Sequence, residues 1–219
     1  MIGKLQYISQ GETPQEHLEN IQSACVSGAV WVQLRLKNLE SKIILETAKK
    51  AREITLHFNA LLIINDYYKI AKEVEADGVH LGKKDCCPLQ VSAYLGAAFI
   101  IGGTANTLED CKELLAKKVD YIGLGPYQFT KTKKQLSPVL GIAGYRSLLA
   151  TLQTKIPIIA IGGIGLTAVD EIMKTGVYGI ALSGAITKDF KSIPIFNDIM
   201  KASSVQEQES EVAQIHIEF

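Results

Sequence analysis

An excess of charge of either sign is missing from this sequence. The 23 lysines and arginines are balanced by 23 aspartates and glutamates, so the formal net charge at pH 7 is zero. Nucleic acids and anionic membranes attract proteins through clustered Lys and Arg side chains, and the chain has no dense basic stripe. We therefore expect neither nucleic acid nor a membrane surface as the main partner.

Long apolar runs and cysteines are also scarce. No stretch approaches the about 20 uninterrupted apolar residues of a membrane span, and the opening MIGKLQYISQGETPQ lacks the apolar core of a signal peptide. A cytoplasmic protein is therefore expected. The 4 cysteines, two of them adjacent at Cys86 and Cys87, have neither the density of a disulfide scaffold nor the paired spacing of a zinc site. Free thiols are the simplest interpretation.

Short β-branched apolar runs are what the sequence has in abundance. Each is followed by a stretch with helical periodicity, such as TLEDCKELLAKK after Asn106. This alternation predicts parallel βαβ units, because each strand needs a crossover helix before the next. The eight predicted strands begin at Leu5, Trp31, Leu61, Gly78, Phe99, Tyr121, Pro157 and Tyr178.

Eight such units predict an α/β protein with a (β/α)8 TIM barrel, formed as a single domain by residues 1–201. A doubly wound parallel sheet has the same alternation and is the competing architecture, but the count of eight favours the barrel. Thr107 and Thr167 stand where helix N-caps are expected. The polar segment 202–219 is predicted to be a mobile or loosely docked tail.

The carboxyl ends of the strands are where such a barrel builds its active site. In the second predicted strand, alternation of side chains places Gln33, Arg35 and Lys37 on one face. On a surface strand this row would be a solvated face. If the row faces the barrel interior, it requires an anionic or hydrogen-bonding partner, and a phosphate group suits Arg plus Lys best.

Two carboxylates follow neighbouring predicted strands. Asp66 ends the third run and Asp85 follows the fourth. Side by side on the rim, they would supply oxygen ligands to Mg2+, whose remaining positions are taken by water and substrate phosphate. Asp66 alone would more simply cap the following helix. Together with Asp85 and the cationic row, it favours a magnesium site.

Glycines and hydroxyl residues end the later strands. Gly162-Gly163 and Ser183-Gly184 offer backbone N–H groups that a phosphate can approach closely, since no large side chain intervenes. They follow the seventh and eighth strands, the usual phosphate site of these barrels.

The segment TKTKK at 130–134 is polar and cationic and precedes the seventh strand. It would need no explanation as a surface loop. Above a rim rich in phosphate-binding groups, it is expected to be a lid that contacts substrate when it closes. The rim as a whole therefore indicates an enzyme that handles two anionic groups. His80 lies inside a strand and is expected to be packed or hydrogen-bonded rather than to act as a base.

Several of these segments together resemble the thiamine phosphate synthase family, also called thiamine-phosphate pyrophosphorylase. The resemblance covers about residues 4–200, with six motifs in the family's order: VQLRLK, IIND, DGVHLG followed by Asp85, IGGTANT, DYIGLGP with TKTK, and IPIIAIGGI. It implies a Mg2+-dependent transferase of thiamine biosynthesis. Such an enzyme condenses 4-amino-2-methyl-5-(diphosphooxymethyl)pyrimidine with 4-methyl-5-(2-phosphooxyethyl)thiazole and releases pyrophosphate.

The resemblance also implies roles for individual residues. Arg35, Lys37 and Lys133 would be catalytic, because they would stabilise the negative charge on departing pyrophosphate. Asp66 and Asp85 would hold Mg2+. The implied pyrimidine diphosphate contacts are Gln33, Arg35, Lys37, Asn65, Thr104 and Lys133, and the implied thiazole phosphate contacts are Thr130, Thr132, Gly163, Ser183 and Gly184.

The sequence departs from the family pattern at a few of these positions. Thr104 replaces a serine but keeps its hydroxyl, and Gly184 replaces a serine but keeps the backbone amide. Asn106 replaces a usual histidine, which bears on how the pyrimidine is positioned, and Tyr67 stands where a small polar or acidic residue is frequent.

Two other functions share this barrel. A thiazole tautomerase, an isomerase, would bind only the thiazole phosphate, and a non-catalytic binder of thiamine intermediates would need no metal. The combined presence of the cationic residues and the two aspartates argues against both. The partners expected are small-molecule substrates. The sequence leaves the oligomeric state open, a homo-oligomer included.

Overall fold

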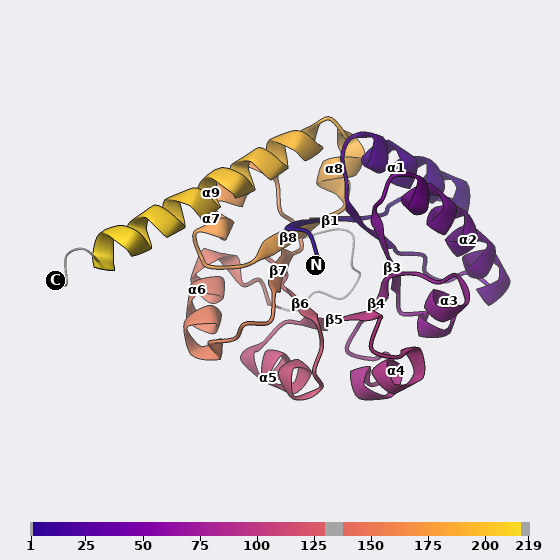
Figure 1. The fold of residues 1–219 in the computed structure, drawn as a ribbon, viewed down its shortest axis with the longest axis horizontal. Coiled ribbons are helices and arrows are strands. Elements are labelled where there is room, and N and C mark those ends of the chain that lie inside the picture. Colours follow the sequence, from indigo (N-terminus) through magenta and orange to yellow (C-terminus); the bar gives the residue numbers. More distant parts are fainter. Residues whose placement is uncertain (1, 130–137, 216–219) are drawn as a thin grey trace.

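Eight parallel strands close into a barrel in the computed structural model, which describes residues 2–129 and 138–215, with side chains described up to residue 203. Each strand pairs with the next in sequence, and β8 pairs with β1, so the predicted TIM barrel is confirmed and the open doubly wound sheet is wrong. The helices form a ring outside the strands (Figure 1).

All eight predicted strands are present, close to their expected starts. They are β1 (Leu5–Ile8), β2 (Trp31–Leu34), β3 (Leu61–Asn65), β4 (Gly78–Leu81), β5 (Ile100–Ala105), β6 (Tyr121–Leu124), β7 (Ile158–Ile161) and β8 (Gly179–Leu182). The agreement follows from local chemistry, because short β-branched runs between turn residues suit a fully buried parallel strand.

Helices connect the strands in the order expected for βα units. They are α1 (Pro14–Val26), α2 (Ser41–His57), α3 (Tyr68–Glu73), α4 (Pro88–Leu95), α5 (Leu108–Ala116), α6 (Gly141–Leu152), α7 (Val169–Met173), α8 (Gly184–Lys188) and α9 (Ser192–Ile215), with a 3-10 turn η1 (Leu166–Ala168) before α7. Within the described residues, no helix is both long and apolar enough to cross a membrane.

Helix ends test two sequence predictions. Thr107 caps α5 as expected, because its hydroxyl accepts the Asp110 N–H while the Asp110 carboxylate accepts the Thr107 N–H. Thr167 was predicted to be an N-cap, but it lies inside the 3-10 turn that precedes α7, so this prediction is wrong. The residues before α7 tighten into the i→i+3 turn that often begins a short helix.

The last helix crosses residue 201, where the sequence predicts that the barrel ends and the tail begins. α9 continues without a break from Ser192 to Ile215, packs beside α7 and extends away from the barrel (Figure 1). The division between residues 1–201 and 202–219 thus has no counterpart in a change of secondary structure. The mobility of the tail stays a prediction.

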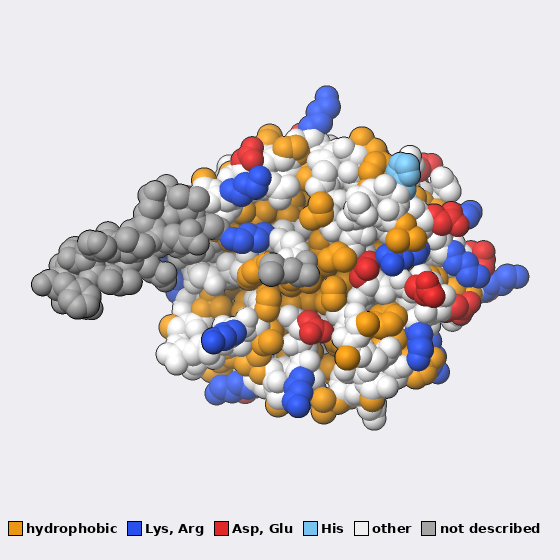
Figure 2. Space-filling model, in the orientation of Figure 1, with side chains coloured by type: hydrophobic (Ala, Val, Ile, Leu, Met, Phe, Trp, Pro, Cys, Tyr) orange, Lys and Arg blue, Asp and Glu red, His pale blue; other side chains and the backbone are white. Residues whose placement is uncertain are grey.

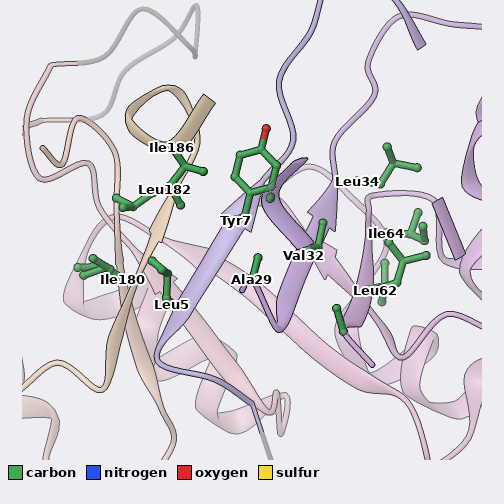
Figure 3. Packing of buried hydrophobic residues seen from close by; sticks show 14 of the residues in the cluster. Leu5, Tyr7, Ala29, Val32, Leu34, Leu62, Ile64, Ile180, Leu182 and Ile186 are labelled. Atoms are coloured by element: carbon green, nitrogen blue, oxygen red, sulfur yellow. The ribbon is translucent and has the colours of Figure 1, made fainter. Parts of the chain in front are cut away.

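The main hydrophobic core lies between the strands and the helical ring. Alternate residues of neighbouring strands, such as Tyr7, Val32 and Leu34, contribute side chains to this layer, where they lie side by side (Figure 3). Tyr7 pairs in register with Val32, so the pleat places their side chains on the same face of the sheet. The residues of opposite parity point into the barrel, and this fixes which side chains can reach the site.

A smaller cluster fills the barrel interior. Trp31, Ile63, Tyr121 and Ile159 are fully buried there, and the Trp31 and Tyr121 rings meet edge to face at 5.0 Å between centroids. Tyr121 has room only because its neighbour in β5 is glycine: a Cβ on Gly102 would lie 2.2 Å from Tyr121 Cζ. The interior below the rim is therefore a packed core rather than a channel.

Charged side chains are dispersed on the molecular face turned to the viewer in Figure 2. Lys, Arg, Asp and Glu alternate around its periphery, while hydrophobic side chains gather toward its centre (Figure 2). This face carries no basic patch, in keeping with the balanced composition.

Replacing Gly102 by alanine should destabilise the barrel. The added methyl group must displace the Tyr121 ring, which is fully buried, so we expect a loss of about 1–3 kcal/mol in the free energy of unfolding. Urea denaturation would measure it. Gly165→Ala is the control, because a Cβ there has no atom within 4 Å and its φ is −110°. Equal stability of the two variants would contradict the packing argument.

Candidate active site

A cavity of about 650 Å³ opens at the carboxyl ends of the strands. Its walls come from both ends of the chain and from the middle, because the barrel closes β8 against β1. The residues predicted from the sequence that line it are Gln33, Arg35, Asn65, Thr104, Gly163, Ser183 and Gly184. Side chains separated by up to 151 positions, from Gln33 to Gly184, thus meet around one space.

A second cavity of about 270 Å³ lies beside the first and shares Arg35 with it. Lys37 lines this smaller space, so the predicted row of Gln33, Arg35 and Lys37 runs from the main cavity into its neighbour. β2 ends at Leu34, so the two cationic residues stand on the loop that leaves the strand. Burial lowers the pKa of Arg35, and the nearby Asp66 carboxylate opposes that shift.

Asp66 contacts the cationic row rather than the helix that follows it. Its Oδ2 atom lies 3.1 Å from Lys37 Nζ. The N-cap of α3 is Tyr67, and no side chain caps this helix, so the simpler interpretation of Asp66 as a helix cap is wrong. Asp66 also has φ of 66°, a left-handed conformation that is uncommon for residues other than glycine and that is often found at functional sites.

Asp85 stands beside Asp66, as the neighbouring strand ends predict. Burial raises the pKa of Asp85 to about 6, and the neighbouring Asp66 carboxyl group adds to the rise. The Gly82 N–H, which donates to Asp85 Oδ2 at 2.6 Å, opposes it and holds the loop in place. Two carboxylates this close repel each other when both are ionised, unless a cation lies near them.

The donor set suits a magnesium ion. Mg2+ is held in many proteins by one or two carboxylates, with water and substrate phosphates completing its shell. In the parts of the chain that the structure describes, no group of three or more His, Cys, Asp or Glu residues could hold a metal by itself. Asp66 and Asp85 therefore fit a metal that is shared with a substrate, and they do not fit a closed structural site.

A buried hydrogen-bond network forms the floor of the main cavity. His80 joins Tyr121 Oη through Nδ1 at 3.0 Å and Thr104 Oγ1 through Nε2 at 2.8 Å. Tyr121 Oη also accepts from Gln6 Nε2 at 3.4 Å, and Gln6 Oε1 accepts from Gln33 Nε2 at 3.1 Å. His80 is thus packed and hydrogen-bonded, as its place within a strand predicts. Burial raises the pKa of Tyr121, which keeps the phenol neutral.

Asn65 has a buried side-chain donor that the described residues leave unused. The residue is 5% exposed, lines the main cavity, and its Nδ2 atom has no hydrogen-bond partner among the described residues. A buried amide without a partner costs about 1–3 kcal/mol, so such a group is expected where a ligand supplies the acceptor.

The opposite wall is formed by small residues after β7 and β8. Gly162 and Gly163 have φ of 89° and 73°, and a Cβ on Gly163 would lie 2.8 Å from the Gln128 carbonyl oxygen. Only glycine therefore suits this turn. Ser183 faces the same cavity, where its hydroxyl donates to Gln10 Oε1 at 3.3 Å.

Lys188, at the end of α8, adds a cation to this wall. It is not among the site residues predicted from the sequence. Within the described residues, no carboxylate forms an ion pair with it. The sequence offers little indication of Lys188, because this residue lies five positions beyond Ser183 in a polar segment.

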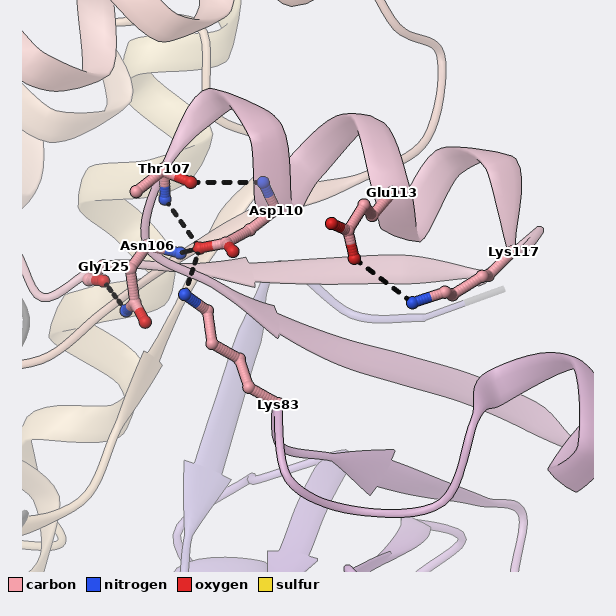
Figure 4. Close-up of polar contacts among 7 residues, drawn as sticks. All are labelled: Lys83, Asn106, Thr107, Asp110, Glu113, Lys117 and Gly125. Carbon is pink, nitrogen blue, oxygen red and sulfur yellow. Dashed lines mark hydrogen bonds and ion pairs between the residues drawn. The ribbon is translucent and has the colours of Figure 1, made fainter.

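Asn106 takes part in a set of polar contacts that joins three rim loops. Its side-chain Nδ2 donates to the Gly125 carbonyl, and its backbone N–H donates to Asp110 Oδ2 at 2.8 Å (Figure 4). Lys83, from the loop after β4, forms an ion pair with the same carboxylate. Burial alone would raise the pKa of Asp110, but these contacts lower it. The loops after β4 and β5 are thus tied to the end of β6.

Three predicted site residues lie outside the described residues, namely Thr130, Thr132 and Lys133. The sequence analysis missed Gln6 and Tyr121 as well as Lys188. Gln6 and Tyr121 stand within predicted strands with no polar pattern around them, so only the barrel's closure shows that they meet.

Comparison with known proteins agrees with this arrangement. The family described as thiamine monophosphate synthase matches residues 5–186. A protein of Flavobacterium psychrophilum named thiamine-phosphate synthase is 47% identical over 204 residues, which cover 92% of this chain and 99% of that protein. The protein of the same name from Bacteroides fragilis is 46% identical over 83% of this chain and 91% of its own.

A solved structure shares both fold and sequence. The thiamine phosphate pyrophosphorylase of Pyrococcus furiosus superposes with a TM-score of 0.77 at 30% identity, over 91% of this chain and 96% of that one. This chain belongs to the thiamine monophosphate synthase family.

Proposed function

We propose that the cavity at the barrel rim condenses a pyrimidine diphosphate with a thiazole phosphate, with Mg2+ held by Asp66 and Asp85. The activity itself is that of the family: the chain is a thiamine-phosphate synthase, an enzyme of thiamine biosynthesis that releases pyrophosphate. The observation that supports the residue roles best is the grouping of Lys37, Asp66 and Asp85 beside Arg35, which lines a cavity whose other wall is rich in glycine.

The cationic side suits the pyrimidine diphosphate. Arg35 and Lys37 offer two positive charges, and Asn65, which lines the main cavity with Arg35, has an amide donor without a partner among the described residues. Gln33 and Thr104 belong to the buried network below, which fixes their orientations. We assign Gln33 and Thr104 to the pyrimidine ring and the charged residues to the diphosphate.

The two aspartates would hold Mg2+ between the protein and the diphosphate. When bound, the ion supplies Lewis acidity and neutralises negative charge on the phosphate oxygens. Lys37, which contacts Asp66, adds its own positive charge at the same place.

The glycine-rich wall suits the thiazole phosphate. Gly163, Ser183 and Gly184 provide a hydroxyl and close backbone access, and Lys188 provides a cation without a carboxylate partner among the described residues. Thr130, Thr132 and Lys133 complete the proposed contacts from the segment outside the described residues.

The reaction requires the protein mainly to bind and orient the two substrates, and it requires little proton transfer. The pyrimidine CH2–O bond breaks first, and pyrophosphate departs with the electron pair while the ring stabilises the remaining cation. Arg35 and Lys37 lower the energy of this step by stabilising charge that develops on the leaving group. The thiazole nitrogen then forms the new C–N bond, because its phosphate has fixed the ring nearby. A general base is not needed, in keeping with a hydrogen-bonded His80.

The thiazole tautomerase and the regulatory binder are the competing functions. Neither needs the pair of aspartates beside two cations, which is the feature that favours the synthase. A cytoplasmic location and a homo-oligomeric state stay predictions.

The synthase assay tests the central claim. With Mg2+ and both substrates, the purified protein should release one pyrophosphate per thiamine phosphate formed. Arg35→Ala and Asp66→Ala should each lower kcat/KM by about 100-fold or more, since each removes charge stabilisation from the leaving group.

Asp198→Asn is the matched control for this assay, because Asp198 is an exposed carboxylate on α9, a helix that supplies none of the described residues lining either cavity. It should retain normal rates. Tautomerase activity of the intact protein without pyrophosphate release would overturn the assignment.

Magnesium binding can be measured apart from turnover. Titration of Mg2+ into protein saturated with inorganic pyrophosphate should give a calorimetric signal that Asp85→Asn weakens about tenfold or more, since the variant loses one of two anionic ligands. Asp198→Asn should bind like the unmodified protein. Equal Mg2+ affinity in Asp85→Asn would remove Asp85 from the metal site.

Lys188 gives a test of the thiazole side. Lys188→Gln should raise KM for the thiazole phosphate several-fold, about 1 kcal/mol, and leave KM for the pyrimidine diphosphate unchanged. Lys191→Gln removes a nearby exposed lysine that does not line the cavity and should change neither constant. If both variants behave alike, Lys188 does not contact the phosphate.

A further inference from the structure

Arg35 is held in place by a contact outside the main cavity. β1 and β2 end at Ile8 and Leu34, yet their pairing continues for one more step. Ser9 N–H donates to the Gln33 carbonyl at 2.8 Å, and Arg35 N–H then donates to the Ser9 side-chain Oγ at 3.0 Å. A side-chain hydroxyl therefore takes the place of a ladder carbonyl at the point where Arg35 leaves the barrel wall.

Ser9 is itself held by His17. The Ser9 Oγ and His17 Nδ1 atoms are 2.7 Å apart, and the two residues are 3% and 7% exposed. When the imidazole is neutral with its proton on Nε2, the Ser9 hydroxyl donates to His17 Nδ1 while its oxygen accepts the Arg35 N–H. Two consecutive hydrogen bonds thus link the Arg35 backbone through Ser9 to the imidazole ring.

The imidazole suits the acceptor role. Burial lowers the pKa of His17, a hydrogen bond with the Gly11 backbone opposes this, and the positive charge of Arg35 lowers it further. A neutral ring at neutral pH leaves Nδ1 free to accept the Ser9 proton. His17 lies in the first turn of α1, so these hydrogen bonds connect the Arg35 backbone to a helix.

These residues lie at the boundary between the two cavities. Ser9, His17 and Arg35 all line the smaller cavity, and Arg35 alone among them also lines the main one. A shift at the end of β2 would therefore move the guanidinium relative to the space assigned to the diphosphate.

We propose that Ser9 and His17 are positioning residues, which fix the backbone of Arg35 so that its guanidinium is placed for the diphosphate of the pyrimidine substrate. They act through Arg35 and touch no reacting atom. This inference rests on the proposed role of Arg35 in the synthase.

Ser9→Ala should raise KM for the pyrimidine diphosphate about five- to tenfold and leave KM for the thiazole phosphate unchanged, since one hydrogen bond to the Arg35 backbone is lost. Ser9→Thr keeps the hydroxyl and should restore most of the affinity. His17→Gln is a second variant with the same expected direction, because an amide oxygen replaces the ring acceptor only in part.

A double-mutant cycle separates positioning from general stability. Binding of inorganic pyrophosphate with Mg2+, measured by calorimetry, should weaken about fivefold in Ser9→Ala but less than twofold when Ser9→Ala is added to Arg35→Ala. Without the guanidinium, its placement no longer matters. Equal weakening in both backgrounds would show a role in folding alone and would overturn the proposal.

Thr55→Val is the matched control, because it removes another fully buried hydroxyl, one that donates to the Arg52 carbonyl far from either cavity lining. It should lower stability without changing either KM. If the intact protein releases no pyrophosphate, the synthase assignment fails. If it does, and Ser9→Ala behaves like Thr55→Val, the positioning role alone is wrong.

Discussion

Closure of the barrel is the constraint on which the other features depend. β8 pairs with β1, so the strand ends form a ring and the loops that follow them share one rim. Parallel strands leave no alternative, because every carboxyl end must point the same way. Arg35 and Ser183 therefore line one cavity although the chain separates them widely, and Asp66 lies near Arg35 and Lys37. The packed interior, with Trp31 and Tyr121 in edge contact, lies beneath that cavity.

The charged residues of the rim are unevenly distributed between its two sides. Lys37 lies against Asp66, and Asp85 is beside them, so cations and carboxylates meet on the wall formed by β2 to β4. The wall after β7 and β8 offers glycine backbone and a single lysine. Between them, the network around His80 fixes the floor in a neutral, hydrogen-bonded state. The division suits a reaction in which one substrate loses a diphosphate with a metal and the other is held by its phosphate.

Asn106 helps to hold the rim together. It donates to the Gly125 carbonyl and shares the Asp110 carboxylate with Lys83, so its loop is tied to the loops on either side. Thr104 provides the hydroxyl that His80 contacts.

Local patterns in the sequence predict the eight strands that the barrel has, and they place Arg35, Lys37, Asp66 and Asp85 at the strand ends. These depend on local periodicity and on the rule that parallel strands place their carboxyl ends together. Thr167 was misassigned because the tightening of η1 depends on packing that no local pattern shows. Only the tertiary structure decided that Gln6 reaches Tyr121 across 115 positions, and that Ser9 holds Arg35. Such contacts depend on strand register and side-chain direction, which become fixed when the barrel closes.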